Sequence, residues 1–192
     1  KGLSRLETSK SFTRDLLRKY GIPGNPRHET FTSLSGIEAF MQDLPGIVVK
    51  PDGLTGGKGV KVQGDHFQTR EEALEYCREV LREHPAVVIE EKLEGEEFSL
   101  QCITDGKTVV ATPPVQDHKR RFVDDRGPNT GGMGSYSDAD HCLPFMRPED
   151  VTEGLAITQR VAEAIHRETG DYYRGIMYGG FMITRDGVRL VE

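Results

Sequence analysis

The sequence lacks several features that would place it in well-defined classes of protein. It has no apolar run near the roughly 20 residues of a membrane-spanning helix, and no charged-then-apolar secretory start. Its 3 cysteines are widely spaced without a Cys-x-x-Cys pair, so neither a disulfide framework nor a zinc site is expected. The net charge of −6 argues against general nucleic-acid binding. These absences favour a globular protein of the reducing cytoplasm with no nucleic-acid or membrane partner.

The length of 192 residues is sufficient for one large or two small domains with a buried core. The chain opens on Lys1 rather than Met and stops at Glu192 inside a predicted strand. We therefore expect a segment of a longer polypeptide. No internal repeat or low-complexity tract is present.

Apolar periodicity, caps and turn residues predict an α/β order of elements. Helices are expected after a cap at Thr8 or Ser9, over 35–42, after a cap at Thr69, and over 148–168. Strands are expected near 29–32 and over 47–50, 59–63, 87–91, 97–104, 109–112, 175–184 and 188–192. Residues 113–147, rich in Gly, Pro, Asn and Asp, are predicted to form a long loop that is functional or mobile.

The most informative segment, residues 50–62, reads Lys-Pro-Asp-Gly-Leu-Thr-Gly-Gly-Lys-Gly-Val-Lys-Val between two β-like runs. Glycine lets backbone N–H groups approach a ligand, and nearby lysines favour phosphate. A Walker A loop would need Gly in place of Asp52 and Ser or Thr in place of Gly59, and no helix follows as a Rossmann turn would require. The segment is therefore predicted to be a hairpin flap over polyphosphate. The alternative is an ordinary glycine-rich hairpin tip with solvated lysines.

Two further segments have the composition of binding sites. Residues 87–99 form a buried strand that runs into five glutamates within the eight positions Glu90 to Glu97, a cluster suited to the hydroxyl and amine donors of a nucleoside. Residues 113–135 combine Asp117, the basic residues 119–121 and the glycines of 131–134, whose N–H groups are expected to form an anion nest. The alternatives are a solvated acidic turn and a flexible solvated loop, respectively.

Taken in order, these motifs resemble the ATP-grasp region of the glycinamide ribonucleotide synthetases (phosphoribosylamine–glycine ligases). The resemblance extends from about Leu6 to Glu192, and its most specific parts are Gln-Asp-His-Lys-Arg at 116–120 and Gly-Pro-Asn-Thr-Gly-Gly-Met-Gly at 127–134. It implies an ATP-grasp fold of the α/β (α+β) class, with two subdomains that each have a largely antiparallel sheet and helices, and ATP bound between them. The implied organisation is a linker and leading helix at 1–22, a small lid subdomain at 23–91 with its flap at 51–59, and a large subdomain at 92–192 that is incomplete at its C-terminal end.

The resemblance also implies a role for individual residues. ATP would be held by Lys10 and Lys50, by the flap residues Asp52, Gly53, Gly56, Gly57, Lys58 and Gly59, by the adenine hinge Glu90, Glu91, Lys92 and Leu93, and by the ribose-binding Glu97. Glycine and 5-phosphoribosylamine would meet the catalytic set Asp117, Lys119, Arg120, Asn129, Thr130, Gly131 and Gly132. Glu192 would bind Mg²⁺ or Mn²⁺.

The implied reaction joins glycine to 5-phosphoribosylamine through glycyl phosphate, in purine biosynthesis. The alternatives are another ATP-grasp ligase, or a non-catalytic ATP-binding fragment. Two departures from the family pattern bear on activity. The domains before and after the ATP-grasp region are missing, together with the metal-binding asparagine expected two residues after Glu192. Gly180 stands where many ATP-grasp enzymes carry a second acidic metal ligand, which weakens the case for a two-metal site.

Overall fold

The structure is a computed structural model that describes residues 2–56, 59–123 and 126–192. The chain divides into two compact units. Unit 1 consists of Leu3–Asp15 and Pro26–Leu93, and unit 2 consists of Leu16–Asn25 and Glu94–Glu192. The helix α2 (Lys10–Lys19) contributes to both units because the division falls within it. Among the described residues, no helix combines the length and apolar character that crossing a membrane requires.

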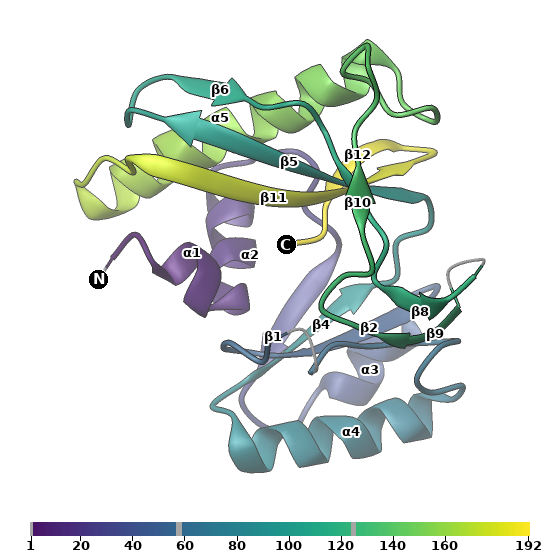
Figure 1. Cartoon of the computed structure of the whole chain (residues 1–192). Coiled ribbons are helices and arrows are strands. Elements are labelled where there is room, and N and C mark those ends of the chain that lie inside the picture. The colour runs from purple at the N-terminus through teal and green to yellow at the C-terminus, as the bar shows by residue number, and fades with distance from the viewer. Residues whose placement is uncertain (1, 57–58, 124–125) are drawn as a thin grey trace. The chain divides into compact units, whose positions relative to one another are not determined.

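Unit 1 is built on a four-stranded antiparallel sheet in the order β1-β4-β2-β3. The strands are β1 (His28–Phe31), β4 (Val87–Glu91), β2 (Ile47–Pro51) and β3 (Lys61–Val62). The helices α3 (Ile37–Gln42) and α4 (Arg70–Glu83) lie on the same side of this sheet (Figure 1). A short helix, α1 (Arg5–Thr8), precedes α2.

The two faces of this sheet have different characters because side chains alternate along a strand. Ile47 and Val49 of β2, and Val87 and Ile89 of β4, join the apolar core with residues of α3 and α4. The alternate positions, which include Lys50, therefore point to the opposite face. That opposite face carries the buried charged groups described below.

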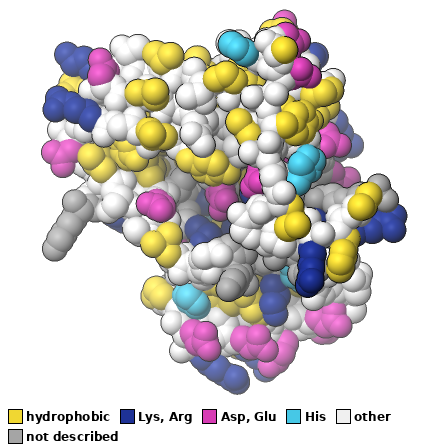
Figure 2. Space-filling model, viewed as in Figure 1, with side chains coloured by type: hydrophobic (Ala, Val, Ile, Leu, Met, Phe, Trp, Pro, Cys, Tyr) yellow, Lys and Arg dark blue, Asp and Glu magenta, His cyan; other side chains and the backbone are white. Residues whose placement is uncertain are grey.

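The helix α4 illustrates how local sequence sets an element of unit 1. The Thr69 hydroxyl accepts a hydrogen bond from the N–H of Glu72, whose carboxylate accepts one from the N–H of Thr69, so a capping box starts the helix as expected. Ala73, Cys77 and Val80 are buried at helical spacing. Figure 2 shows charged side chains of both signs on the exposed side of this end of unit 1.

Unit 2 is built on a second antiparallel sheet, in the order β12-β11-β5-β6. Its strands are β5 (Glu96–Thr104), β6 (Val109–Ala111), β11 (Gly175–Thr184) and β12 (Gly187–Leu190). The long helix α5 (Pro148–Thr169) runs along one face of β5 and β11 (Figure 1). Beneath α5, the rings of Phe98 and Phe181 stack with their centroids 5.4 Å apart.

The other face of this sheet is partly open. Ile176, Ile103 and Val110 are consecutive cross-strand partners on β11, β5 and β6, and each is more than half exposed. Hydrophobic side chains accordingly gather over these strands in Figure 2. Farther along the same face, Tyr178 and Ser99 lead to the polar hollow described in the next section.

The main difference from the expected elements lies at 113–147, which was predicted to be a long loop. It contains β7 (Gln116–Asp117), β8 (Arg120–Phe122), β9 (Arg126–Asn129) and β10 (Ser135–Tyr136). β10 pairs with β7, and β8 pairs with β9. Each of these strands is too short to show periodicity in the sequence. The strands form because they pair with one another within the segment, and no local apolar pattern indicates them.

Several boundaries also differ from expectation. The helix expected after a cap at Thr8 or Ser9 is confirmed as α2, whose first turn is capped by the Ser9 hydroxyl accepting the N–H of Phe12, but the short helix α1 before it was not expected. The helix expected from residue 35 begins at Ile37, after Gly36 in the left-handed region. β3 is limited to Lys61–Val62. β12 ends at Leu190, after which the N–H groups of residues 191 and 192 both donate to the carbonyl of Gly180, so that the regular ladder stops.

Candidate functional site

A buried ionic triad lies on the polar face of the unit 1 sheet. The carboxylate of Glu90 is held by Arg14, whose Nε donates to Oε1 at 2.7 Å and whose Nη2 donates to Oε2 at 3.0 Å. The ammonium of Lys50 lies 2.9 Å from the same Oε2. All three side chains are at most 6% exposed. We call these residues the buried triad.

The charges of the buried triad set the protonation of Glu90. Burial alone would raise the pKa of this carboxyl, but the neighbouring Arg14 and Lys50 lower it to about 2. Glu90 is therefore ionised at neutral pH. Because its two oxygens accept hydrogen bonds from Arg14 and Lys50, the carboxylate holds the positive charges of these two side chains together.

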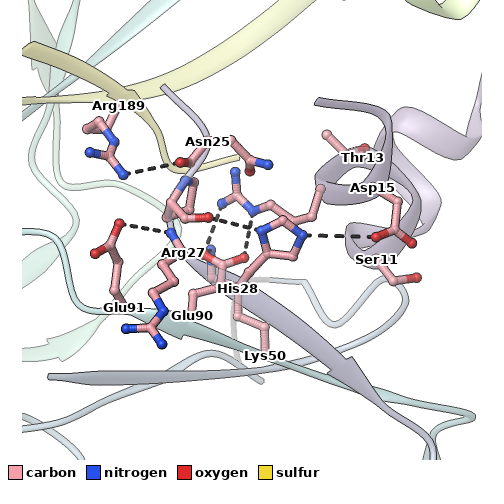
Figure 3. Close-up of polar contacts among 12 residues, drawn as sticks. Ser11, Thr13, Asp15, Asn25, Arg27, His28, Lys50, Glu90, Glu91 and Arg189 are labelled. Carbon is pink, nitrogen blue, oxygen red and sulfur yellow. Dashed lines mark hydrogen bonds and ion pairs between the residues drawn. The ribbon is translucent and has the colours of Figure 1, made fainter. Parts of the chain in front are cut away.

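Arg14 is a site residue that the sequence did not indicate. It lies on α2, 76 positions before Glu90, in a stretch that reads only as an amphipathic helix. The same region holds His28, which is the cross-strand partner of Glu90. The His28 ring shares a hydrogen bond of 2.9 Å with the Pro26 carbonyl, and its Nε2 lies 4.0 Å from the carboxylate of Asp15 (Figure 3).

A second group of contacts joins the start of α2 to the start of the flap. The carboxylate of Asp52 accepts hydrogen bonds from the Ser11 N–H at 3.1 Å, the Ser11 hydroxyl at 2.6 Å and the Ser9 hydroxyl at 3.2 Å. Lys10 lies between these serines, and its Nζ donates to the carbonyl of Gly53 at 2.6 Å. We call Ser9, Lys10, Ser11, Asp52 and Gly53 the flap clasp. The structure thus brings Lys10 together with two predicted flap residues.

The remaining flap positions are only partly described. Gly56 has a φ of 59°, a conformation that glycine adopts without strain. At the far side of the flap, the carbonyl of Gly59 accepts a hydrogen bond of 2.8 Å from the hydroxyl of Tyr76 on α4. Gly57 and Lys58, which were predicted to contact ATP, lie outside the described residues.

The predicted adenine hinge continues from β4. One carboxylate oxygen of Glu91 accepts the N–H of Arg27 at 2.8 Å (Figure 3). The ammonium of Lys92 donates to the carbonyl of Gln63 at 2.9 Å, and Leu93 is half-buried. The side chains of Glu91 and Lys92 therefore support neighbouring backbone. Hinge contacts to an adenine stay a prediction.

Unit 2 contains a polar hollow at the end of its central strands. It is lined by side chains of β5, β7, β11 and the segments that follow β7 and β12, among them Glu97, Asp117, Lys119, Tyr178 and Glu192. We call it the carboxylate hollow. The structure therefore brings together predicted ribose, substrate and metal residues that lie up to 95 positions apart in the sequence.

Lys119 is the basic residue of this hollow. Partial burial would lower the pKa of its ammonium, but Tyr178, Glu97, Glu192 and Asp117 outweigh this effect and raise the pKa above the ordinary lysine value. The ammonium is therefore charged at neutral pH. Tyr178, which sequence reasoning did not single out, shares a hydrogen bond of 3.0 Å with the Ser99 hydroxyl.

Glu192 is held in the carboxylate hollow through Gly180. The Gly180 N–H donates to the Glu192 carbonyl at 2.8 Å, and the Glu192 N–H donates back to the Gly180 carbonyl at 3.2 Å. A Cβ at residue 180 would lie 3.3 Å from Glu192 Cγ, so glycine makes room for this side chain. Gly180 thus supports the predicted metal ligand although it supplies no ligand atom from a side chain.

In the predicted anion nest at 131–134, two of the four N–H groups bind other parts of the same segment. The N–H of Gly132 donates to the Thr130 hydroxyl at 3.1 Å, and the N–H of Met133 donates to the carbonyl of His118 at 2.7 Å. These two N–H groups are thus used within the loop. Thr130 in turn donates its N–H and its hydroxyl to the carbonyl of Lys119. The glycine loop therefore supports the segment that carries Lys119.

The other predicted substrate residues occupy less defined positions. Arg120 pairs with Asn129 across β8 and β9, and its guanidinium donates to the carbonyl of Gly127 at 2.9 Å. Gly131 is exposed, and nothing lies within 4 Å of the position that a Cβ would occupy. Asp117 is half-buried and lies beside Gly132, where a Cβ would be 3.3 Å from its carboxylate. Contacts of these residues with substrates stay predictions.

Comparison with known proteins identifies the fold and the family. Residues 8–192 match the family model described as phosphoribosylglycinamide synthetase, ATP-grasp (A) domain. The chain is 49% identical over 192 residues to a phosphoribosylamine–glycine ligase from Methanocella arvoryzae, and the match covers 100% of this chain and 44% of that protein. The chain therefore spans less than half the length of this relative.

Solved structures agree with this match. A phosphoribosylamine–glycine ligase from Thermotoga maritima superposes with a TM-score of 0.83 at 32% identity, over 98% of this chain and 47% of that one. A D-alanine–D-alanine ligase from Coxiella burnetii superposes with a TM-score of 0.70 at 16% identity, over 98% of this chain and 48% of that one, and thus shares the fold alone. The expected ATP-grasp fold is confirmed. The chain belongs to the phosphoribosylglycinamide synthetase ATP-grasp (A) domain family.

Proposed function

We propose that this chain is the ATP-binding core of a phosphoribosylamine–glycine ligase of purine biosynthesis. The observation that carries the proposal is the extent of the similarity, since close to half of the residues are identical to an enzyme of that name along the whole chain. The D-alanine ligases share the fold but not this level of identity. Because the relatives are more than twice as long, the complete reaction is proposed for the polypeptide that contains this domain. A cytoplasmic location fits such an enzyme.

The proposed reaction needs activation of a carboxylate, which is a poor acylating agent. The glycine carboxylate attacks the γ-phosphate of ATP, giving glycyl phosphate and ADP. The amine of 5-phosphoribosylamine then attacks the acyl carbon, phosphate leaves, and the amide of glycinamide ribonucleotide forms. Such chemistry depends on alignment and charge neutralisation more than on covalent catalysis. It therefore does not need a nucleophilic Ser or Cys.

We assign nucleotide binding to the charged groups of unit 1 and to Glu97. Lys10 and Lys50 each carry an ammonium held by defined partners, which suits contact with phosphate oxygens. The hinge from Glu90 to Leu93 is assigned to the adenine side, with Glu90 acting through the buried triad. Glu97 is exposed at the carboxylate hollow, where its oxygens can accept ribose hydroxyls.

We assign the chemical step to the carboxylate hollow. Lys119 would neutralise charge on the transferred phosphoryl group and on glycyl phosphate, which is the form of help that this reaction requires. Asp117 lies on the same hollow and is suited to bind the amine of a substrate. Arg120 and the segment 129–132 come after Lys119 in the sequence, and we assign them to the phosphate and ribose of 5-phosphoribosylamine.

Mg²⁺ or Mn²⁺ fits this hollow as an ion that binds together with the phosphates of ATP. Glu192 lines the hollow and offers the hard oxygen ligands that these ions prefer. The described residues contain no group of three or more His, Cys, Asp or Glu side chains able to hold a metal, so a protein cage is not formed there. Mg²⁺ commonly binds through one or two carboxylates together with substrate phosphates, and it neutralises their charge when bound.

Phosphate release from ATP tests the proposal directly. We expect release to require glycine and 5-phosphoribosylamine together, and the Lys119→Met variant to lose most of the rate while still binding ATP. Lys107→Met is a matched control, because Lys107 is an exposed lysine in the turn between β5 and β6.

The same assay separates the two alternatives. Release stimulated by a different carboxylate and amine would assign the chain to another ATP-grasp ligase. ATP binding without stimulation by either substrate, in a polypeptide of the relatives' full length, would make the domain a nucleotide-binding module and refute the proposed reaction.

A further inference from the structure

We propose that Asp52 is a positioning residue that orients Lys10 toward the nucleotide phosphates, rather than a group that contacts the nucleotide itself. This inference rests on the proposed function, since it presupposes that the chain binds ATP. It deepens that function by changing the role of one predicted flap residue. It also gives the segment from Ser9 to Ser11 a part in nucleotide binding.

The hydrogen bonds of Asp52 are directed into α2. Oδ2 accepts the Ser11 hydroxyl at 2.6 Å, Oδ1 accepts the Ser11 N–H at 3.1 Å, and the Ser9 hydroxyl lies 3.2 and 3.3 Å from the two oxygens. A carboxylate that faced a triphosphate would repel it. The arrangement instead directs the negative charge of Asp52 toward hydroxyl and N–H donors of the protein.

The same bonds fix Lys10 from both sides. Ser9 and Ser11 are its chain neighbours, and both bind Asp52. The tip of Lys10 is fixed as well, because Nζ donates to the Gly53 carbonyl at 2.6 Å. An ammonium has three N–H donors, so this bond orients the group and leaves donors to meet an anion.

The flap side of the clasp is fixed to the sheet. The N–H of Asp52 donates to the carbonyl of Ala86 at 3.0 Å, immediately before β4. The clasp therefore connects the first turn of α2 to the ends of two strands. Asp52 already supplies a negative charge to the N-terminus of α2. A phosphate would therefore interact with the ammonium of Lys10 rather than with the N–H groups at the helix end.

A double-mutant cycle in ligand affinity tests this role. Calorimetry would measure ATP and adenosine binding to the wild-type chain, Asp52→Asn, Lys10→Met and the double variant. We expect Asp52→Asn to weaken ATP binding about fivefold in the wild-type background, and by no more than roughly twofold when Lys10 is already Met. Adenosine, which has no phosphate, should bind equally well to all four proteins.

Two controls keep the outcome interpretable. Glu38→Gln removes a negative charge from an exposed position of the same unit, and it should leave both affinities unchanged. Ser11→Ala removes the 2.6 Å bond but keeps the carboxylate, and it should weaken ATP binding in the same direction as Asp52→Asn. If Asp52→Asn does not fold, the Ser11→Ala variant is used for the test in its place.

The possible results have distinct meanings. An equal loss in the wild-type and Lys10→Met backgrounds would show that Asp52 acts independently of Lys10 and would overturn the inference. Equal weakening of ATP and adenosine, or no weakening by Asp52→Asn, would overturn it too. Failure of the wild-type chain to bind ATP would instead refute the proposed function on which the inference rests.

Discussion

Glu90→Gln is the substitution that tests the buried triad most directly. Glutamine keeps the shape of the side chain and one carbonyl acceptor, but it removes the negative charge that faces Arg14 and Lys50. Both cations are buried, so they cannot recover the lost interaction from water. We expect the folded state of unit 1 to lose a large part of its stability.

The magnitude follows from the pKa of Glu90. A shift from 4.5 in the unfolded chain to about 2 in the folded one corresponds to about 3 kcal/mol, at roughly 1.4 kcal/mol per pKa unit. Removing one partner of a buried ion pair typically costs about 3–5 kcal/mol, which agrees with this value. We therefore expect Glu90→Gln to lower the free energy of unfolding by about 3 kcal/mol at pH 7.

The pH dependence has a defined sign. Because the folded pKa of Glu90 lies below the unfolded one, the ionised carboxylate contributes its full stability above about pH 4.5 and loses it as the pH falls toward 2. The difference in unfolding free energy between wild type and Glu90→Gln should thus fall to less than half at pH 3. At pH 7 and at pH 6 it should be the same.

Urea unfolding followed by circular dichroism measures the total effect, and hydrogen exchange of the β2 and β4 amides assigns it to unit 1. Glu83→Gln, an exposed change at the end of α4, serves as the control. A loss below about 1 kcal/mol at pH 7, or an equal loss at pH 3 and pH 7, would contradict the ionic account of the buried triad.

Two other substitutions test individual ligand-binding roles. Lys50→Met should weaken ATP binding at least roughly tenfold by removing a charge-assisted contact, while Arg14 continues to hold Glu90; unchanged affinity by calorimetry would exclude a phosphate contact. Gly180→Ala places a Cβ 3.3 Å from Glu192 Cγ and should raise the Mg²⁺ concentration needed for phosphate release by roughly tenfold. An unaltered Mg²⁺ dependence would show that Glu192 is not a metal ligand.

Elements with a strong local signal could be predicted from the sequence. The capping box of α4 and the buried strand β4 have the expected positions because their signals lie within the segments themselves. The strands from β7 to β10 could not be predicted in the same way. Each has at most four residues, and each exists because another part of the same segment supplies its hydrogen bonds.

The candidate site shows the same limit at the level of side chains. The family resemblance implied nucleotide-binding roles for Lys50 and Glu90, yet nothing in the sequence connects them with Arg14. Asp52 was predicted to contact ATP because the family resemblance includes it in the glycine-rich flap. Its oxygens instead accept hydrogen bonds from residues more than 40 positions earlier, at Ser9 and Ser11.

A motif therefore predicts the region where a ligand binds better than it predicts which side chains contact that ligand. Whether a charged side chain in a glycine-rich loop meets a ligand or supports one that does depends on the groups that other segments bring to it. Buried carboxylates with protein donors on both oxygens lower the free energy of the folded site before any ligand arrives. In this chain Glu90 is buried and Asp52 is partly buried, both accept protein donors on both oxygens, and the lysines beside them are the groups that we propose to meet phosphate. The measurable consequence is that changes at these two acids should alter affinity for phosphate through the neighbouring lysine, and adenosine should not detect the change at Asp52.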